Sequence, residues 1–144
     1  MSNQTAAPAP IAVTVAYAAD SQGTGLAYAL VRGSQRERVL RVPFRVRPVP
    51  GLGGRENGYA ALRAVATELR ERGVKAVSLR VDDVELVRDI RERRDLPTVL
   101  TVPYVAVRCA LNRFAFAEVA LGDDERGRDL AARARAEVTL NLAA

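Results

Sequence analysis

The sequence predicts one α/β domain built on a five-stranded mixed sheet. Three segments near the N-terminus alternate between apolar and polar residues and are separated by short turns, which indicates an antiparallel meander. Strand and helix patterns then alternate, and this order predicts parallel strands joined by crossover connections. The length of 144 residues, of which 49% are hydrophobic, suffices for one core of ordinary size.

Three strands are expected in the meander, at 11–20, 26–32 and 38–47, with turns at 21–25 and 33–35. The third strand has an apolar face at the even-numbered positions from 40 to 46. Its opposite face carries Arg41, Arg45 and Arg47. Pro43 indicates that this strand lies at an edge of the sheet or contains a bulge.

Helical patterns predominate in the rest of the chain. The segment 57–72 is expected to be a helix whose apolar stripe is Leu62, Val65, Ala66 and Leu69. The segment 103–112 fits a helix or a strand, and we favour a helix because Pro103 suits a first helical turn. The remaining expected elements are a strand at 75–81, a short helix from 82 to 94, a loop at 95–102, a strand at 114–121 and a helix at 125–138.

The composition excludes several kinds of site. The chain has no histidine and one cysteine, Cys109, which rules out a Cys/His zinc site, a histidine-activated nucleophile and a disulfide framework. Any bound metal would have oxygen ligands, which suit Mg²⁺ or Mn²⁺. No apolar run reaches the roughly 20 residues that a membrane span needs. Residues 1–10 form a small, polar lead-in that we expect to be disordered, and the protein is expected to be cytoplasmic.

The basic residues are nearly all arginine. The net charge is 22 − 17 = +5, and Lys75 is the only lysine among the 22 basic residues. One explanation is a GC-rich genome, which replaces lysine by arginine on a solvated surface. The other is a phosphate-binding face, because the guanidinium fork matches phosphate oxygens. The positions of the arginines must decide between these explanations.

The order of the expected elements resembles that of the ribonuclease H-like family over residues 11–138. The segment 80–87 is similar to the end of the family's fourth strand, where an aspartate precedes a Leu-Val pair. The segment 17–21 resembles the end of the family's first strand, an aromatic residue followed by Asp, Gly and Ser. This resemblance implies a cluster of carboxylates that holds two divalent metal ions and cleaves the RNA of RNA–DNA hybrids.

The resemblance implies Asp83, Asp20 and Asp129 as candidate catalytic and metal-binding residues. Asp83 matches the aspartate that ends the fourth strand, and its alternative role is to cap the following helix. Asp20 matches after a shift of two residues, which keeps it on the same face; otherwise Ala18 takes that position and Asp20 is a turn residue. Asp129 matches after a shift of one residue, and otherwise Arg128 takes that position.

One part of the family's site is missing. Gly58 stands where the family has its catalytic glutamate, within a segment, 57–62, that otherwise resembles the family's first helix. Glu56 lies about 200° around the helix from Gly58 and cannot replace the missing carboxylate. The family's auxiliary loop histidine has no counterpart either. We therefore expect an incomplete two-metal site.

Three functions agree with these observations, and we favour the first. The chain binds nucleic acid, an RNA–DNA hybrid or a duplex, through Arg41, Arg45 and Arg47, with further arginines in 91–94, and has little or no hydrolytic activity. Alternatively, it is an active Mg²⁺- or Mn²⁺-dependent endoribonuclease that uses the three aspartates. The third possibility is a protein-interaction module, such as a homodimer, that pairs through the final helix and the tail 138–142.

Overall fold

The computed structural model describes residues 9–33, 36–92 and 96–143, with side chains up to residue 140. Residues 1–8 of the expected disordered lead-in lie outside the described residues, while Ala9 and Pro10 are exposed and belong to no helix or strand. The elements are β1 (Ile11–Ala19), β2 (Thr24–Arg32), β3 (Glu37–Arg45), α1 (Arg55–Glu71), β4 (Ala76–Val81), α2 (Val84–Glu92), the 3-10 helix η1 (Thr98–Leu100), α3 (Thr101–Leu111), β5 (Phe116–Leu121) and α4 (Glu125–Ala143).

The five strands form one mixed sheet in the order β3-β2-β1-β4-β5. Strands β1, β2 and β3 are antiparallel neighbours, whereas β4 runs parallel to β1, and β5 runs parallel to β4. This confirms the fold class predicted from the sequence. The register pairs Val15 of β1 with Val81, the last residue of β4. Strand β1 therefore continues past the end of β4, and this overhang creates the end of the sheet discussed below.

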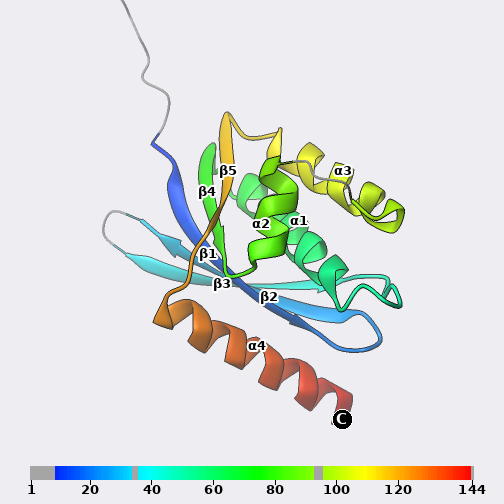
Figure 1. Ribbon diagram of the computed structural model, residues 1–144. Helices are drawn as coiled ribbons and strands as arrows, with labels where there is room; N and C mark the ends of the chain where they lie inside the picture. Colours follow the sequence, from blue (N-terminus) through cyan, green and yellow to red (C-terminus); the bar gives the residue numbers. More distant parts are fainter. Residues whose placement is uncertain (1–8, 34–35, 93–95, 144) are drawn as a thin grey trace, which may run out of the picture.

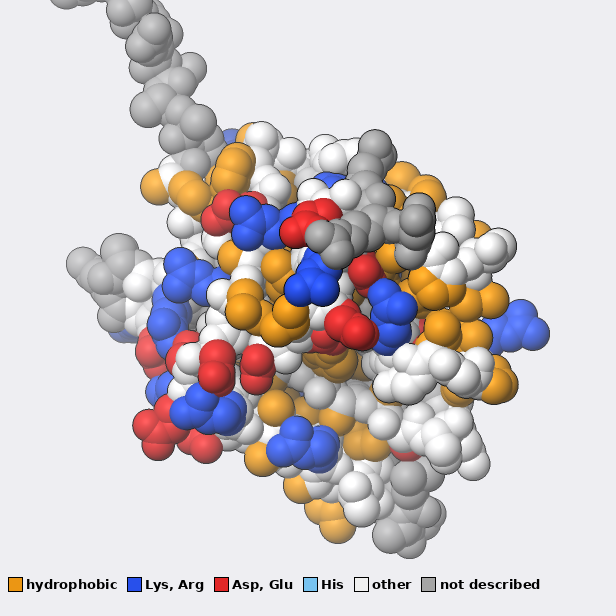
Figure 2. Space-filling view, viewed as in Figure 1, with side chains coloured by type: hydrophobic (Ala, Val, Ile, Leu, Met, Phe, Trp, Pro, Cys, Tyr) orange, Lys and Arg blue, Asp and Glu red, His pale blue; other side chains and the backbone are white. Residues whose placement is uncertain are grey.

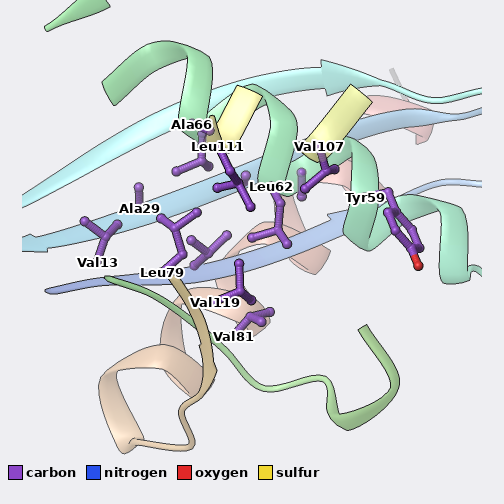
Figure 3. Packing of buried hydrophobic residues seen from close by; sticks show 14 of the residues in the cluster. Val13, Ala29, Tyr59, Leu62, Ala66, Leu79, Val81, Val107, Leu111 and Val119 are labelled. Carbon is purple, nitrogen blue, oxygen red and sulfur yellow. The ribbon is translucent and has the colours of Figure 1, made fainter. Parts of the chain in front are cut away.

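Helices cover the sheet on both faces. Helices α1, α2 and α3 lie on one face, and α4 crosses the other face over β1 and β2 (Figure 1). The larger core lies beneath α1, and Figure 3 shows side chains of α1 and α3 gathered against those of the sheet strands. All four residues of the predicted α1 stripe are buried.

Helix α4 packs on the sheet through a narrow stripe. Leu130, Ala134 and Val138 are buried at helical spacing, and they form a second cluster with residues of β1 and β2 that includes Tyr28 and Leu30. The helix continues to Ala143, so the prediction that it ends near 138 is wrong, and the tail 138–142 is helical. The apolar face that we considered for a partner is therefore used within the molecule.

Strands β1 and β3 end before their predicted boundaries, because the turns that follow them begin while apolar and polar residues still alternate in the sequence. Strand β1 ends at Ala19, so Asp20 lies in the turn that follows, and β3 ends at Arg45, so Arg47 lies beyond it. The expected loop at 95–102 contains η1 and the start of α3. The ambiguous segment 103–112 is helical, as favoured. No helix in the described part of the chain is long and apolar enough to cross a membrane.

Candidate functional site

The candidate site lies where β1 runs past the end of β4. Tyr17 follows Val13 and Val15 on the face of β1 that α1 covers, because every second residue of a strand faces the same side. Its hydroxyl donates a hydrogen bond of 2.9 Å to Oδ2 of Asp83, which stands just after β4. We call these two side chains the tyrosine–aspartate pair.

Asp83 has a structural role that occupies both of its carboxylate oxygens. Its Oδ1 accepts a hydrogen bond of 3.1 Å from the backbone N–H of Leu86, and its backbone carbonyl accepts one from Val87. This is the geometry of an N-cap residue for α2. Because Oδ2 accepts from Tyr17, each oxygen of the residue that best matches the family's metal ligand is already hydrogen-bonded.

Tyr17 is held in its neutral form. Burial raises the pKa of the phenol far above its ordinary value, and the negative charge and hydrogen bond of Asp83 raise this pKa further. The charge of Asp82 acts in the same direction. A neutral phenol donates one proton, and here that proton goes to Asp83.

Gly58 forms the third side of this site. A Cβ atom at Gly58 would lie 2.8 Å from the hydroxyl of Tyr17 and 2.7 Å from Cδ2 of Leu86. Both distances are shorter than a carbon atom tolerates, so the tyrosine ring and Leu86 occupy the volume that a larger side chain on α1 would need. The absence of the family's glutamate and the position of Tyr17 are thus two aspects of one packing arrangement.

The other two predicted aspartates lie apart from the tyrosine–aspartate pair. Asp20 organises the β1–β2 turn, where its Oδ1 accepts hydrogen bonds from the backbone N–H groups of Gln22 (2.8 Å) and Thr24 (3.0 Å). Asp129 is exposed on α4. Among the residues that the structure describes, no three Asp, Glu, Cys or His side chains form a group that could hold a metal ion.

These residues do not fit the two divalent metal ions that the family resemblance implies. Two metal ions need several carboxylates with free oxygens at one place. Here the only well-matched carboxylate bonds to a phenol and a helix N-terminus, and the position of the glutamate is a glycine packed against that phenol. We therefore derive no step that passes through a bound metal.

A hollow of about 440 Å³, lined by both apolar and charged residues, lies on the other side of the β4 end, between the sheet and α4. Its walls include Thr14, Asp82, Gly127 and Arg135. The acidic residues before α4 are already paired around it: Asp123 with Arg128 at 2.6 Å and Asp124 with Arg32 at 2.9 Å. Asp124 also caps α4 by accepting a bond of 2.6 Å from the N–H of Gly127. Asp123 and Asp124 thus stabilise the fold, whereas the exposed Asp82 makes no hydrogen bond or ion pair within the described part of the chain.

The three arginines predicted for nucleic-acid binding divide into two groups. Arg41 donates to Glu137 of α4 at 3.0 Å, and the same carboxylate accepts a hydrogen bond from Tyr28. The bond to Glu137 raises the pKa of Arg41, and the bonds from Tyr28 and Arg41 lower the pKa of Glu137. Arg41 thus fastens α4 to the sheet and is not free to bind phosphate in this arrangement.

Arg45 and Arg47 are exposed, and neither forms an ion pair within the described part of the chain. The intervening residue, Val46, donates its backbone N–H to the carbonyl of Gly23 at 2.9 Å. This contact places both arginines beside the β1–β2 turn, at the same end of the sheet as the tyrosine–aspartate pair. Of the further arginines in 91–94, Arg93 and Arg94 lie outside the described residues.

The charges elsewhere on the surface are mixed. Basic and acidic side chains alternate across the face shown in Figure 2, with apolar side chains between them. Most of the described arginines that make contacts pair with a carboxylate, as Arg126 does with Glu37 at 2.9 Å. Arg45 and Arg47 are not the only described arginines without a carboxylate partner, since Arg63 and Arg113 also have none. What distinguishes Arg45 and Arg47 is their position beside the β1–β2 turn.

The role of Tyr17 cannot be read from the sequence, in which this residue only marks the aromatic position at the end of the first strand. The alternation of β1 could have placed Tyr17 on the helix-covered face. A glycine inside a helix, as at Gly58, could have indicated that another group packs closely against the helix there. The partner of Tyr17, 66 positions away in the sequence, could be identified only from the three-dimensional structure.

Comparisons with known proteins agree with this architecture. No family model and no curated protein sequence matches the chain. Solved structures do: ribonuclease H1 from the halophilic archaeon Halobacterium salinarum has a TM-score of 0.70 at 14% identity, covering 90% of this chain and 99% of that one. The compost-derived LC11 ribonuclease H1 has a TM-score of 0.68 at 12% identity, covering 92% and 98%.

The same LC11 enzyme has also been solved with an RNA/DNA hybrid, and that structure matches with a TM-score of 0.59 at 12% identity, covering 90% of this chain and 99% of that one. Identities this low show the fold alone. The chain has a ribonuclease H-like fold over most of its length, as its order of strands and helices predicted.

Proposed function

We propose that the protein binds nucleic acid, an RNA–DNA hybrid or a duplex, and does not hydrolyse it through bound metal ions. The observation that carries the second half is the tyrosine–aspartate pair packed on Gly58. A phenol donating to Asp83 takes the place where the resemblance implies a metal-binding carboxylate cluster. Among the described residues, Asp82 is the carboxylate at the end of β4 that makes no hydrogen bond or ion pair, and one such carboxylate is fewer than two metal ions need.

Two observations support the binding half of the proposal. A ribonuclease H1 with the same fold has been solved together with an RNA/DNA hybrid. In this chain, Arg45 and Arg47 are exposed and unpaired at the end of the sheet that carries the tyrosine–aspartate pair. Guanidinium groups form bidentate hydrogen bonds with phosphate oxygens. Such contacts do not depend on the nucleotide sequence, and salt weakens them.

Binding can be tested by fluorescence anisotropy with a labelled RNA–DNA hybrid over a series of salt concentrations. We expect the double variant Arg45→Ala/Arg47→Ala to bind more weakly and to lower the salt slope by about 2, one unit for each lost phosphate contact. Its matched control is Arg63→Ala/Arg113→Ala, which removes the same charge from exposed arginines elsewhere. An equal loss in both double variants would show that net charge, and not this surface, determines binding.

The competing function is active endoribonuclease cleavage with Mg²⁺ or Mn²⁺ held by Asp83, Asp20 and Asp129. It can be distinguished by incubating the hybrid with the protein and either metal and separating the strands on a denaturing gel. We expect the RNA strand to stay intact. Metal-dependent cleavage that disappears in Asp83→Asn would refute the proposal, because asparagine retains the helix cap but not the charge.

A further inference from the structure

Within the described residues, no strand pairs with the outer edge of β5. Gly122, directly after β5, donates its N–H to the carbonyl of Val81 in β4. Because backbone groups alternate in direction along a strand, the even-numbered residues of β5 point theirs toward β4. The N–H and C=O groups of Ala117, Val119 and Leu121 therefore point away from the sheet.

The two edges of the sheet differ in how they resist further pairing. The edge strand β3 contains Pro43, which has no N–H, and carries exposed arginines, both of which discourage another strand from adding. Strand β5 has neither a proline nor a basic residue. Its one charged residue, Glu118, accepts a hydrogen bond of 2.9 Å from Ser78 in the neighbouring strand.

The rim of the β5 edge is apolar. Phe116 and Leu121, at the two ends of the strand, are 44% and 52% exposed, and Val84 of α2 is 53% exposed. A groove of about 540 Å³ runs between α2 and this edge, lined by Val84, Val87 and Leu121 together with Arg88, Arg91 and Glu92. An edge with open backbone groups and apolar flanks fits an added strand.

We propose that this edge pairs with β5 of a second copy of the chain, in an antiparallel arrangement that continues the sheet across a two-fold axis. Each strand of the described chain already has its place in the sheet. A second copy of β5 fits this edge because, across a two-fold axis, each strand supplies both the N–H donors and the C=O acceptors that the other needs. Side chains of directly opposed residues in an antiparallel pair lie on the same face of the sheet. In a dimer of two β5 strands, an odd-numbered residue must therefore oppose an odd-numbered one, and an even-numbered residue an even-numbered one. Centring the axis on Val119 places Ala117 opposite Leu121, and Glu118 opposite Ala120.

Charge selects this register over the one centred on Glu118. Centring the axis on Glu118 would place two carboxylates directly opposite each other, which destabilises a strand pair. Centring it on Val119 leaves no like charges facing across the strands. It also lets the three residues with outward backbone groups exchange hydrogen bonds with the same three residues of the partner strand.

The size of the contact predicts its strength. A strand of six residues is about 20 Å long, and one sheet layer with its side chains adds only a few hundred Å² of contact per partner. Stable interfaces bury about 800 Å² per partner. We therefore expect a weak dimer that forms reversibly as the protein concentration rises through the micromolar range.

Sedimentation velocity over a wide range of concentrations tests this dimer. We expect wild-type protein to shift from monomer to dimer, Leu121→Lys to stay monomeric, and the control Val39→Lys, on the opposite edge, to behave like wild type. A wild-type protein that stays monomeric throughout, a Leu121→Lys protein that still dimerises, or a Val39→Lys protein that does not would overturn the proposal.

Disulfide cross-linking tests the register without a charged substitution at the edge. In a Cys109→Ser background, mixing the Glu118→Cys chain with the Ala120→Cys chain is expected to give a covalent dimer, because these positions oppose each other. Each chain alone is expected to give none, since two copies of one position lie two residues out of register, beyond disulfide reach. Cross-linking by either chain alone, or none in the mixture, would contradict the proposed register.

Discussion

Asp83, Tyr17 and Gly58 depend on one another at the end of β4. Asp83 lies just after β4, where its two carboxylate oxygens accept hydrogen bonds from the Tyr17 hydroxyl and from the backbone N–H of Leu86 in α2. Tyr17 in turn fits only because Gly58 has no side chain. The three residues form one unit, and any change toward a carboxylate cluster would have to alter more than one of them.

The hydrogen bond from Tyr17 gives a first prediction. Tyr17→Phe is expected to lower the free energy of unfolding by about 1.5–3 kcal/mol, since it removes a hydrogen bond to a charged acceptor. Urea denaturation of Tyr17→Phe, Asp83→Ala and the double variant measures the coupling between the two side chains. Simply additive losses would show that the pair contributes no stability.

The tyrosines give a second prediction. Burial and neighbouring carboxylates raise the pKa values of Tyr17, Tyr28 and Tyr59, which are three of the four tyrosines in the chain. Their contribution to stability is present below the ordinary tyrosine pKa of about 10 and is lost as the pH rises through the raised values. In an absorbance titration, three phenols should stay protonated above about pH 10 until the protein unfolds. Simultaneous ionisation of all four near that pH would contradict these environments.

At the scale of single elements, Gly58 of α1 is a position where glycine is expected to be more stable than alanine, against the usual preference inside a helix. Glycine inside a helix is usually about 1 kcal/mol less stable than alanine. At Gly58 a Cβ atom would push against the hydroxyl of Tyr17 and against Leu86. We expect Gly58→Ala to destabilise the protein, and to do so less in a Tyr17→Phe background, where the hydroxyl is absent. A plain gain in thermal stability from Gly58→Ala would show that the site is looser than described.

Helix α4 is held to the sheet by charge as well as by its apolar stripe. Glu137 accepts bonds from Tyr28 and Arg41, and these bonds lower its pKa. The stabilisation is complete above the ordinary glutamate pKa of about 4.3 and disappears as the pH falls through the lowered value. Glu137→Gln should therefore reduce thermal stability at neutral pH, and the difference from wild type should vanish in acid. A difference that persists unchanged at low pH would argue against this role.

The elements are also where prediction from the sequence succeeded and failed. The order of strands and helices could be predicted because hydrophobic periodicity is local. The ends of β1 and β3 could not, because the Asp20 turn and the contact between Val46 and Gly23 end the strands while the alternation continues. Partners such as Arg41 and Glu137, 96 positions apart, depend on how α4 crosses the sheet.

At the scale of the whole molecule, some arginines form ion pairs between α4 and the sheet, and others have no ion-pair partner among the described residues. Paired arginines fasten helices to the sheet, while Arg45 and Arg47 stay unpaired beside the turn at the end that carries the tyrosine–aspartate pair. The edge at β5 lies on the opposite side of the sheet from β3. A dimer formed there would leave both copies of this basic surface open to nucleic acid.

The proposed function requires that the protein bind a hybrid without a metal ion. This is tested by the affinity for a labelled RNA–DNA hybrid, measured by anisotropy in EDTA and in Mg²⁺ at matched ionic strength. We expect the protein to bind in EDTA as tightly as in Mg²⁺, with an anisotropy that stays constant over time. Binding that requires Mg²⁺, or an anisotropy that falls with time in Mg²⁺ because the RNA strand is cut, would contradict the proposed function.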